Sequence, residues 1–103
     1  MNSPMLRGIE LRYVLTLHLF DRGPATIADL VEMLTSLGFV VDGRPSKSVS
    51  DALRWEIGRG RVHRLGHGRY GPAWMPRGTE HRIYKRVLTL RAAASLSREG
   101  GQL

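Results

Sequence analysis

The chain contains no cysteine. This absence excludes disulfides, thiol catalysis, and the zinc or iron–sulfur sites that depend on cysteine. The sequence also lacks an apolar run near the ~20 residues that a membrane-spanning helix needs, so we expect no membrane as a partner. Residues 1–5 show no basic stretch leading into an apolar one. We therefore expect no secretory signal and a cytoplasmic location.

Catalytic motifs are missing as well. The sequence has no Gly-x-x-x-x-Gly-Lys phosphate loop, no Gly-x-Ser-x-Gly nucleophile elbow and no paired catalytic carboxylates. The four histidines are His18, His63, His67 and His81. None of them is spaced from a carboxylate on the same predicted element in the way that metal ligands are. We expect no enzymatic activity, no metal site, no cofactor and no small-molecule effector.

Acidic residues are few, since the chain holds nine Asp and Glu against sixteen Lys and Arg, a net charge of +7. Residues 1–43 carry three basic and five acidic side chains, whereas residues 44–91 carry twelve basic and three acidic ones. Such a basic half is typical of proteins that bind a polyanion. Arginine, which provides fourteen of the sixteen cations, suits phosphate. A solvated basic face and a coding bias toward arginine are the alternatives.

Apolar periodicity predicts four helices, over residues 9–22, 27–37, 46–58 and 79–97. The pair Gly23-Pro24 ends the first helix, because proline cannot continue it. Thr26, with Asp29 three residues further on, has the pattern of a capping box for the second helix. We expect Thr79 to cap the fourth helix.

The first predicted helix is apolar on two sides, which indicates that it is buried on both. A small domain rarely covers both faces of its first helix, and the last helix repeats apolar residues at 4-3-4 spacing. We therefore expect a symmetric homodimer. Its interface is expected to consist of Ile9, Tyr13, Leu17, Phe20, Ile83, Val87, Leu90 and Ala94. The alternative is that the last helix covers the first helix within one chain.

The third predicted helix presents a polar face opposite its apolar stripe. At 100° per residue this face carries Lys47, Asp51, Arg54 and Trp55. We expect Ser46 or Ser48 to cap the helix. Asp51 stands at the capping-box spacing from Ser48, so capping is its expected role. The alternatives are that Asp51 orients Arg54 or accepts a hydrogen bond from a cytosine N4.

A hairpin is predicted after this helix. The strands 61–65 and 69–71 flank the tight turn Gly66-His67-Gly68, in which two glycines supply the positive φ angles. The hairpin therefore carries arginines on its strands and a histidine at its tip. Residues 39–41, Phe-Val-Val, predict a further short strand.

This order of elements resembles that of the winged helix-turn-helix superfamily. The recognition helix of that superfamily is matched by residues 46–57, and its wing by residues 60–70 with their Gly-x-Gly-x-Tyr pattern. The likeness covers residues 9–75. It is strongest to bacterial winged-helix regulators and small HARE-type winged helices, and more distant to the linker-histone globular domain. One departure is the seven-residue connection 39–45, where the simple motif has three or four residues.

The resemblance implies a mainly α fold with a small β-hairpin, in the order helix, helix, strand, helix, hairpin, helix. It places a winged-helix core over residues 9–75 in a single domain, 1–103. It also implies a double-stranded DNA-binding protein, with helix 46–58 in the major groove and wing 61–71 on the minor groove or phosphates. The expected DNA contacts are Arg44, Lys47, Ser48, Ser50, Arg54, Arg59, Arg61, Arg64, His67 and Arg69.

Three functions fit this interpretation. The first is a homodimeric transcriptional regulator located in the nucleoid. The others are a winged helix that binds proteins, and a nucleoid or RNA-binding protein without sequence preference. Trp55 is expected to pack against the hairpin or the loop 72–78.

Overall fold

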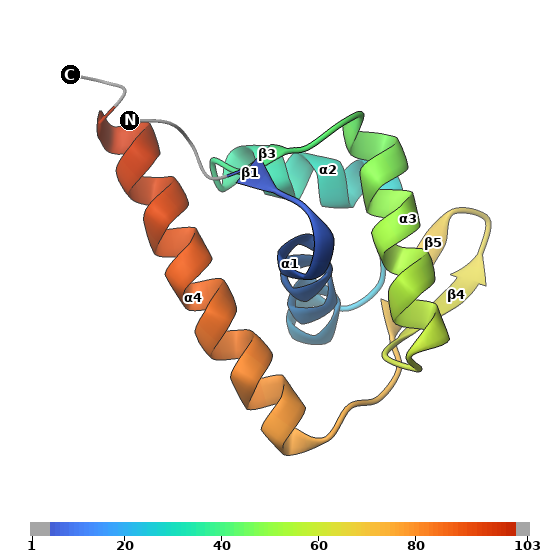
Figure 1. The fold of residues 1–103 in the computed structure, drawn as a ribbon. Helices are drawn as coiled ribbons and strands as arrows, with labels where there is room; N and C mark the ends of the chain where they lie inside the picture. Colours follow the sequence, from blue (N-terminus) through green and yellow to red (C-terminus); the bar gives the residue numbers. More distant parts are fainter. Residues whose placement is uncertain (1–4, 101–103) are drawn as a thin grey trace.

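The computed structural model describes residues 5–100 of the chain, and the side chains of residues 5–96 (Figure 1). Its elements are β1 (Met5–Leu6), α1 (Gly8–Arg22), β2 (Ala25–Thr26), α2 (Ile27–Ser36), β3 (Val40–Val41), α3 (Pro45–Gly58), β4 (Val62–Gly66), β5 (Arg69–Pro72) and α4 (Arg77–Gly100). The prediction of a mainly helical chain with a small antiparallel sheet is confirmed. Within the described residues, no helix combines the length and apolarity needed to cross a bilayer.

α1 lies in the middle of the molecule, with α3 on one side and α4 on the other (Figure 1). Leu15 and Leu19 of α1 are fully buried, and α1 packs against α3, α4 and β5. Side chains from every helix join this core, including Leu34 of α2, Leu53 of α3 and Ile83 of α4. The same chain therefore packs against two sides of its first helix.

The apolar stripe of α4 packs inside the same chain, which corrects the expected dimer interface. Its four buried members are Ile83, Val87, Leu90 and Ala94. On α1, Tyr13, Leu17 and Phe20 are half-buried against the core, and Ile9 is exposed. The alternative arrangement, in which the last helix lies on the first helix of the same chain, is the one observed. The apolar surface that suggested a homodimer is thereby reduced to the partly exposed residues of α1.

The hairpin predicted around the Gly66 and Gly68 turn is present, as β4 and β5. A third strand that the sequence did not predict, β2, pairs with β5, so that the sheet order is β2-β5-β4. The short strand expected at residues 39–41 forms as β3, but it pairs in parallel with β1, away from the hairpin. The two hairpin strands thus pair with each other as expected, whereas β2 and β3 pair with strands distant in the sequence.

Helix starts follow local chemistry only in part. The capping box of α2 is confirmed, because the Thr26 hydroxyl accepts from the Asp29 N–H at 3.0 Å and the Asp29 carboxylate accepts from the Thr26 N–H at 3.1 Å. α3 instead begins at Pro45, whose fixed φ suits a first helical position, with Arg44 as the N-cap residue. The expected serine caps of α3 are therefore wrong. α4 likewise begins at Arg77, so Thr79 lies within its first turn.

Candidate nucleic-acid interface

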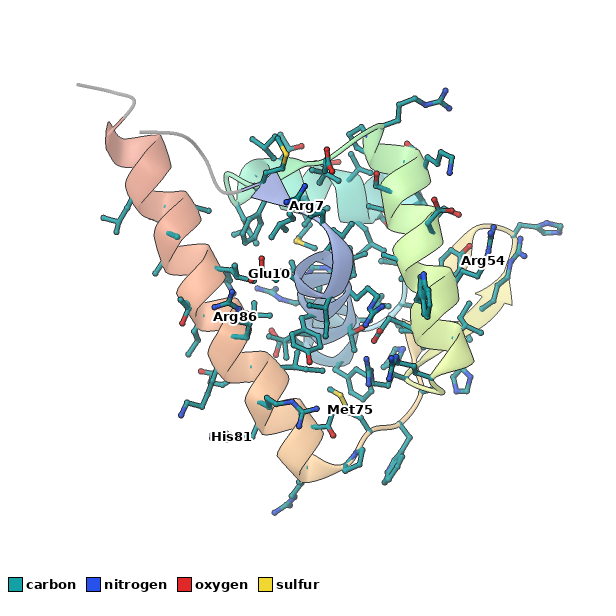
Figure 2. All side chains as sticks on the ribbon, in the orientation of Figure 1. Arg7, Glu10, Arg54, Met75, His81 and Arg86 are labelled. Atoms are coloured by element: carbon teal, nitrogen blue, oxygen red, sulfur yellow. The ribbon has the colours of Figure 1, made fainter. Side chains whose placement is uncertain are left out.

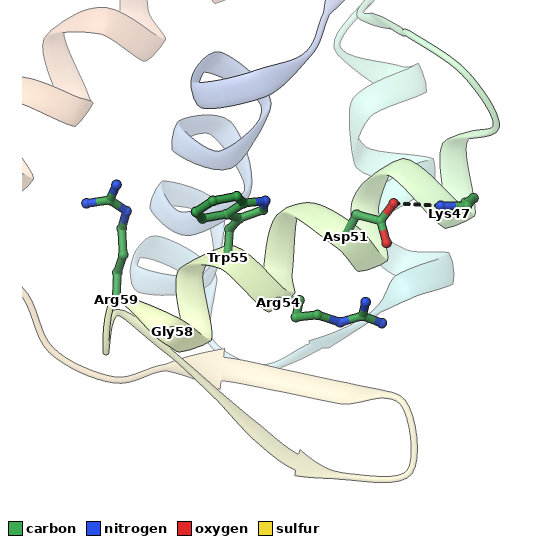
Figure 3. A pocket seen from close by; sticks show the side chains of 6 residues that line it. All are labelled: Lys47, Asp51, Arg54, Trp55, Gly58 and Arg59. Atoms are coloured by element: carbon green, nitrogen blue, oxygen red, sulfur yellow. Dashed lines mark hydrogen bonds and ion pairs between the residues drawn. The ribbon is translucent and has the colours of Figure 1, made fainter.

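The outward face of α3 is a shallow concave surface (Figure 3). The helix buries Val49, Ala52 and Leu53 against the core, and this burial turns the polar residues outward. The surface is lined by Lys47, Asp51, Arg54, Trp55, Gly58 and Arg59. All six lie within α3 or directly after it, so the face predicted from helical periodicity exists as a surface.

Asp51 forms an ion pair on this face rather than a cap. Its carboxylate accepts a hydrogen bond from the Lys47 ammonium at 2.8 Å, one helical turn away (Figure 3). This hydrogen bond is the main cause that lowers the pKa of the Asp51 carboxyl group. Ser48 is engaged as well, because its hydroxyl donates to the Asp42 carbonyl at 2.7 Å. In the described part of the chain, the Arg54 side chain forms no hydrogen bond or ion pair.

Glu56 is fully buried at the end of α3 and holds three other side chains. Arg61 donates to it twice, from Nε to Oε1 at 2.7 Å and from Nη2 to Oε2 at 2.8 Å. The Thr16 hydroxyl donates to Oε1 at 2.6 Å, and Arg12 Nε lies 3.4 Å from Oε2. The network joins α1, α3 and the residue just before β4. It therefore fixes the hairpin relative to α3.

The prediction that Arg61 contacts DNA is therefore wrong. Its guanidinium is committed to Glu56, and only 14% of its side chain is exposed. The hydrogen bond to Glu56 is the largest cause raising the pKa of Arg61, so the group keeps its charge inside the pair. The Arg61 N–H also donates to the Glu56 carbonyl at 3.0 Å. Arg61 therefore shapes the interface from beneath without presenting its charge there.

Trp55 does not pack against the hairpin or the loop 72–78 in the way expected. Its side chain is 61% exposed, and the Arg12 guanidinium of α1 lies 5.4 Å from the centre of its ring. That distance is typical of a cation–π contact. Figure 3 shows Trp55 and Arg54 leaving α3 on different sides, with the indole ring on the side of α1. The surface of α3 thus presents both the aromatic ring of Trp55 and the cation of Arg54.

The hairpin carries the remaining expected contacts. Arg64, His67 and Arg69 are exposed, whereas Tyr70 of the central strand β5 is buried. Arg44 and Arg59, at the two ends of α3, are exposed too, and Ser50 is half-buried. The structure thus brings most of the predicted residues to the outside of α3 and the hairpin. Arg61 is not part of this exposed surface, because it is paired with Glu56. Lys47 and Ser48 are hydrogen-bonded to Asp51 and Asp42.

Sequence reasoning missed the support beneath this interface. Thr16 and Arg12 reach Glu56 from α1, about forty residues earlier in the chain. A signal was present, since Glu56 follows Val49 and Leu53 at helical spacing and so stands in an apolar stripe. A carboxylate at such a position needs buried partners, because an unpaired buried charge is costly. Which partners those are depends on the fold.

No group of three metal-ligating side chains lies together anywhere in the described residues. Comparisons with protein-family models, with curated proteins and with solved structures found no match. The function is therefore inferred from the chemistry of this surface.

Proposed function

We propose that this protein is a winged-helix domain that binds double-stranded DNA, with α3 entering the major groove and the β4–β5 hairpin contacting the flanking backbone or minor groove. One observation carries the proposal. Five exposed arginines lie on α3, at its two ends or on the hairpin, and their side chains make no ion pair or hydrogen bond with any residue that the structure describes. They are Arg44, Arg54, Arg59, Arg64 and Arg69. Free arginines grouped in this way are suited to phosphates and to guanine edges.

The carboxylates of α3 support the same conclusion. Asp51 is held by Lys47, and Glu56 is buried beneath Arg61. Neither acidic group is therefore left free to repel a phosphate on this face. The net field of the surface comes from the arginines, and a polyanion is the partner that such a field attracts.

Dimensions and rigidity also favour the proposal. A helix about 10–12 Å across fits a major groove about 12 Å wide. The Glu56 network anchors the end of α3 to α1 and to the start of β4, so both contact elements are held in one geometry. A rigid pair of elements can meet two parts of one duplex without ordering on binding. The order of the elements, with the hairpin directly after α3, also supports a winged helix.

Selection from a random duplex pool tests the proposal most directly. We expect binding at low salt and enrichment of a short motif, as for a transcriptional regulator acting in the nucleoid. Binding without enrichment would instead favour a nucleoid protein without sequence preference. Failure to bind any duplex at low salt would overturn the proposal.

A protein-interaction module is the second candidate, and two tryptophans favour it. Trp55 and Trp74 are 61% and 70% exposed, and tryptophan is enriched at the centres of protein interfaces. The two candidates differ in their response to Trp74→Ala. DNA binding through the arginines of α3 and the hairpin is expected to survive this change, because Trp74 lies in the loop after β5.

A further inference from the structure

α4 carries a second group of exposed cations outside the α3 and hairpin surface. They are Arg77, Arg82, Lys85 and Arg91. Their cationic side chains form no ion pair or hydrogen bond with another described residue, whereas Arg86 pairs with Glu10 of α1 (Figure 2). Glu80 is the single acidic residue in the stretch 77–96. This part of α4 therefore has a strong positive charge that the fold does not neutralise.

The second group faces away from the first. α3 and α4 lie on opposite sides of α1 (Figure 1), and the buried stripe of α4 packs inward toward the core. At 100° per residue, Lys85 lies nearly opposite that stripe, with Arg77 and Arg82 on either side of it. These three cations therefore lie on the outward half of α4. The molecule presents two cationic surfaces with its core between them.

The charge of α4 selects its partner. A second copy of this chain would bring like charges together, which disfavours pairing of two α4 helices despite the exposed Tyr84 and Leu88. A polyanion has the complementary charge. From Arg77 to Arg91 the helix rises about 21 Å, and duplex DNA carries one phosphate charge per ~1.7 Å of its axis, so several phosphates lie within reach.

We propose that α4 is a second contact surface for the DNA backbone, and that one chain bridges two duplex segments. The inference rests on the proposed function, because the α3 and hairpin surface holds the first segment. α1 and the core separate the two surfaces, so the duplexes meet the protein from opposite sides. Long, flexible cationic side chains on the outward side of α4 make this contact. They bind the phosphates of the DNA backbone, so the contact does not depend on base sequence.

A capture experiment tests bridging. A biotinylated duplex is held on streptavidin beads, a fluorescent duplex without biotin is added, and the captured fluorescence is measured as protein is titrated. We expect the wild type to capture the second duplex. The variant Arg77→Gln/Arg82→Gln/Lys85→Gln should lose at least five-fold in capture, while its affinity for a single duplex changes less than about three-fold.

A variant of equal charge provides the control. Arg54→Gln/Arg59→Gln/Arg69→Gln also removes three cations, but from the first surface, and should weaken both single-duplex binding and capture. Full capture by the α4 variant overturns the inference, as does equal loss of single-duplex affinity in both variants. A wild type that binds one duplex but captures no second overturns bridging alone and leaves the proposed function standing. A wild type that binds no duplex overturns the proposed function itself.

Dimerisation through α4 would also produce capture, and light scattering without DNA separates the two explanations. Bridging by one chain requires a monomer mass for the wild type. A dimeric wild type that becomes monomeric in the α4 variant contradicts the inference. Circular dichroism of both variants, and a milder Arg82→Gln/Lys85→Gln variant, establish that folding is retained at these exposed positions.

Discussion

Arg61 donates two hydrogen bonds, of 2.7 and 2.8 Å, to the carboxylate of Glu56 across the junction between α3 and β4. The pair is buried, and Thr16 and Arg12 of α1 complete its surroundings. Because α3 and the hairpin are the two proposed contact elements, this pair sets the angle between them. A structural ion pair thus lies directly beneath a surface of free arginines.

Glu56→Gln should destabilise the fold while keeping its shape. Removing one partner of a buried ion pair leaves the other charge uncompensated, at a cost of about 3–5 kcal/mol in the free energy of unfolding. Urea denaturation followed by circular dichroism measures the change. Asp51→Asn, which breaks the exposed pair with Lys47, is the control and should leave the unfolding midpoint near that of the wild type. An unchanged midpoint in Glu56→Gln would contradict the role assigned to the network.

Arg54→Ala should weaken binding to the selected duplex by about 1–3 kcal/mol and relax base preference at one position, because a guanidinium that reads a base gives discrimination of that size. Fluorescence anisotropy on the selected site and on single-base variants measures both effects. Arg22→Ala, an exposed arginine at the end of α1, is the matched control. Equal affinity and preference in Arg54→Ala and the wild type would remove α3 as the reading element.

Salt should weaken DNA binding steeply. Each phosphate contact contributes about −0.9 to the slope of log K against log salt, so five free arginines predict a slope of about −4 to −5. Anisotropy titrations between low and moderate salt give this slope. In Arg69→Ala it should become about one unit shallower. A wild-type slope near −1 would be incompatible with the proposed surface.

Stability should fall as the pH drops below the ordinary pKa of histidine. Burial, followed by the nearby charge of Arg22, lowers the pKa of His18 below its ordinary value of 6.5. The unfolded chain then binds a proton that the folded chain resists, so the stabilising contribution is complete above pH 6.5 and is lost as the pH falls toward the folded pKa. Unfolding free energies at pH 7.5 and 5.5 should differ less in His18→Gln than in the wild type. An identical pH dependence in both proteins would refute this assignment.

Ile83→Ala should destabilise the chain without changing its mass. Ile83 is fully buried within the chain, and truncating such a side chain typically costs about 2–5 kcal/mol. Thermal unfolding measures the loss, and light scattering of the folded variant measures the mass. A wild-type dimer that dissociates in Ile83→Ala while staying folded would instead return the α4 stripe to a subunit interface.

Local patterns were enough to predict several parts of this protein from its sequence. The capping box of Thr26 and Asp29, the turn between the hairpin strands and the polar face of α3 each depend on residues within a few positions of one another. Backbone geometry and helical periodicity set these features without reference to distant residues. The concentration of arginine that supports DNA binding is likewise a property of the sequence alone.

Other parts were decided only by the tertiary structure. Arg61 looks identical in sequence to the free arginines near it, but its guanidinium turns inward because the fold buries Glu56 beside it. The stripe of α4 fits either a second copy or α1, and the approach of α4 to α1 within one chain makes the choice. The physical reason is the same in both cases. Burial and long-range pairing depend on how distant elements pack, and a sequence pattern specifies which face is apolar without specifying what will cover it.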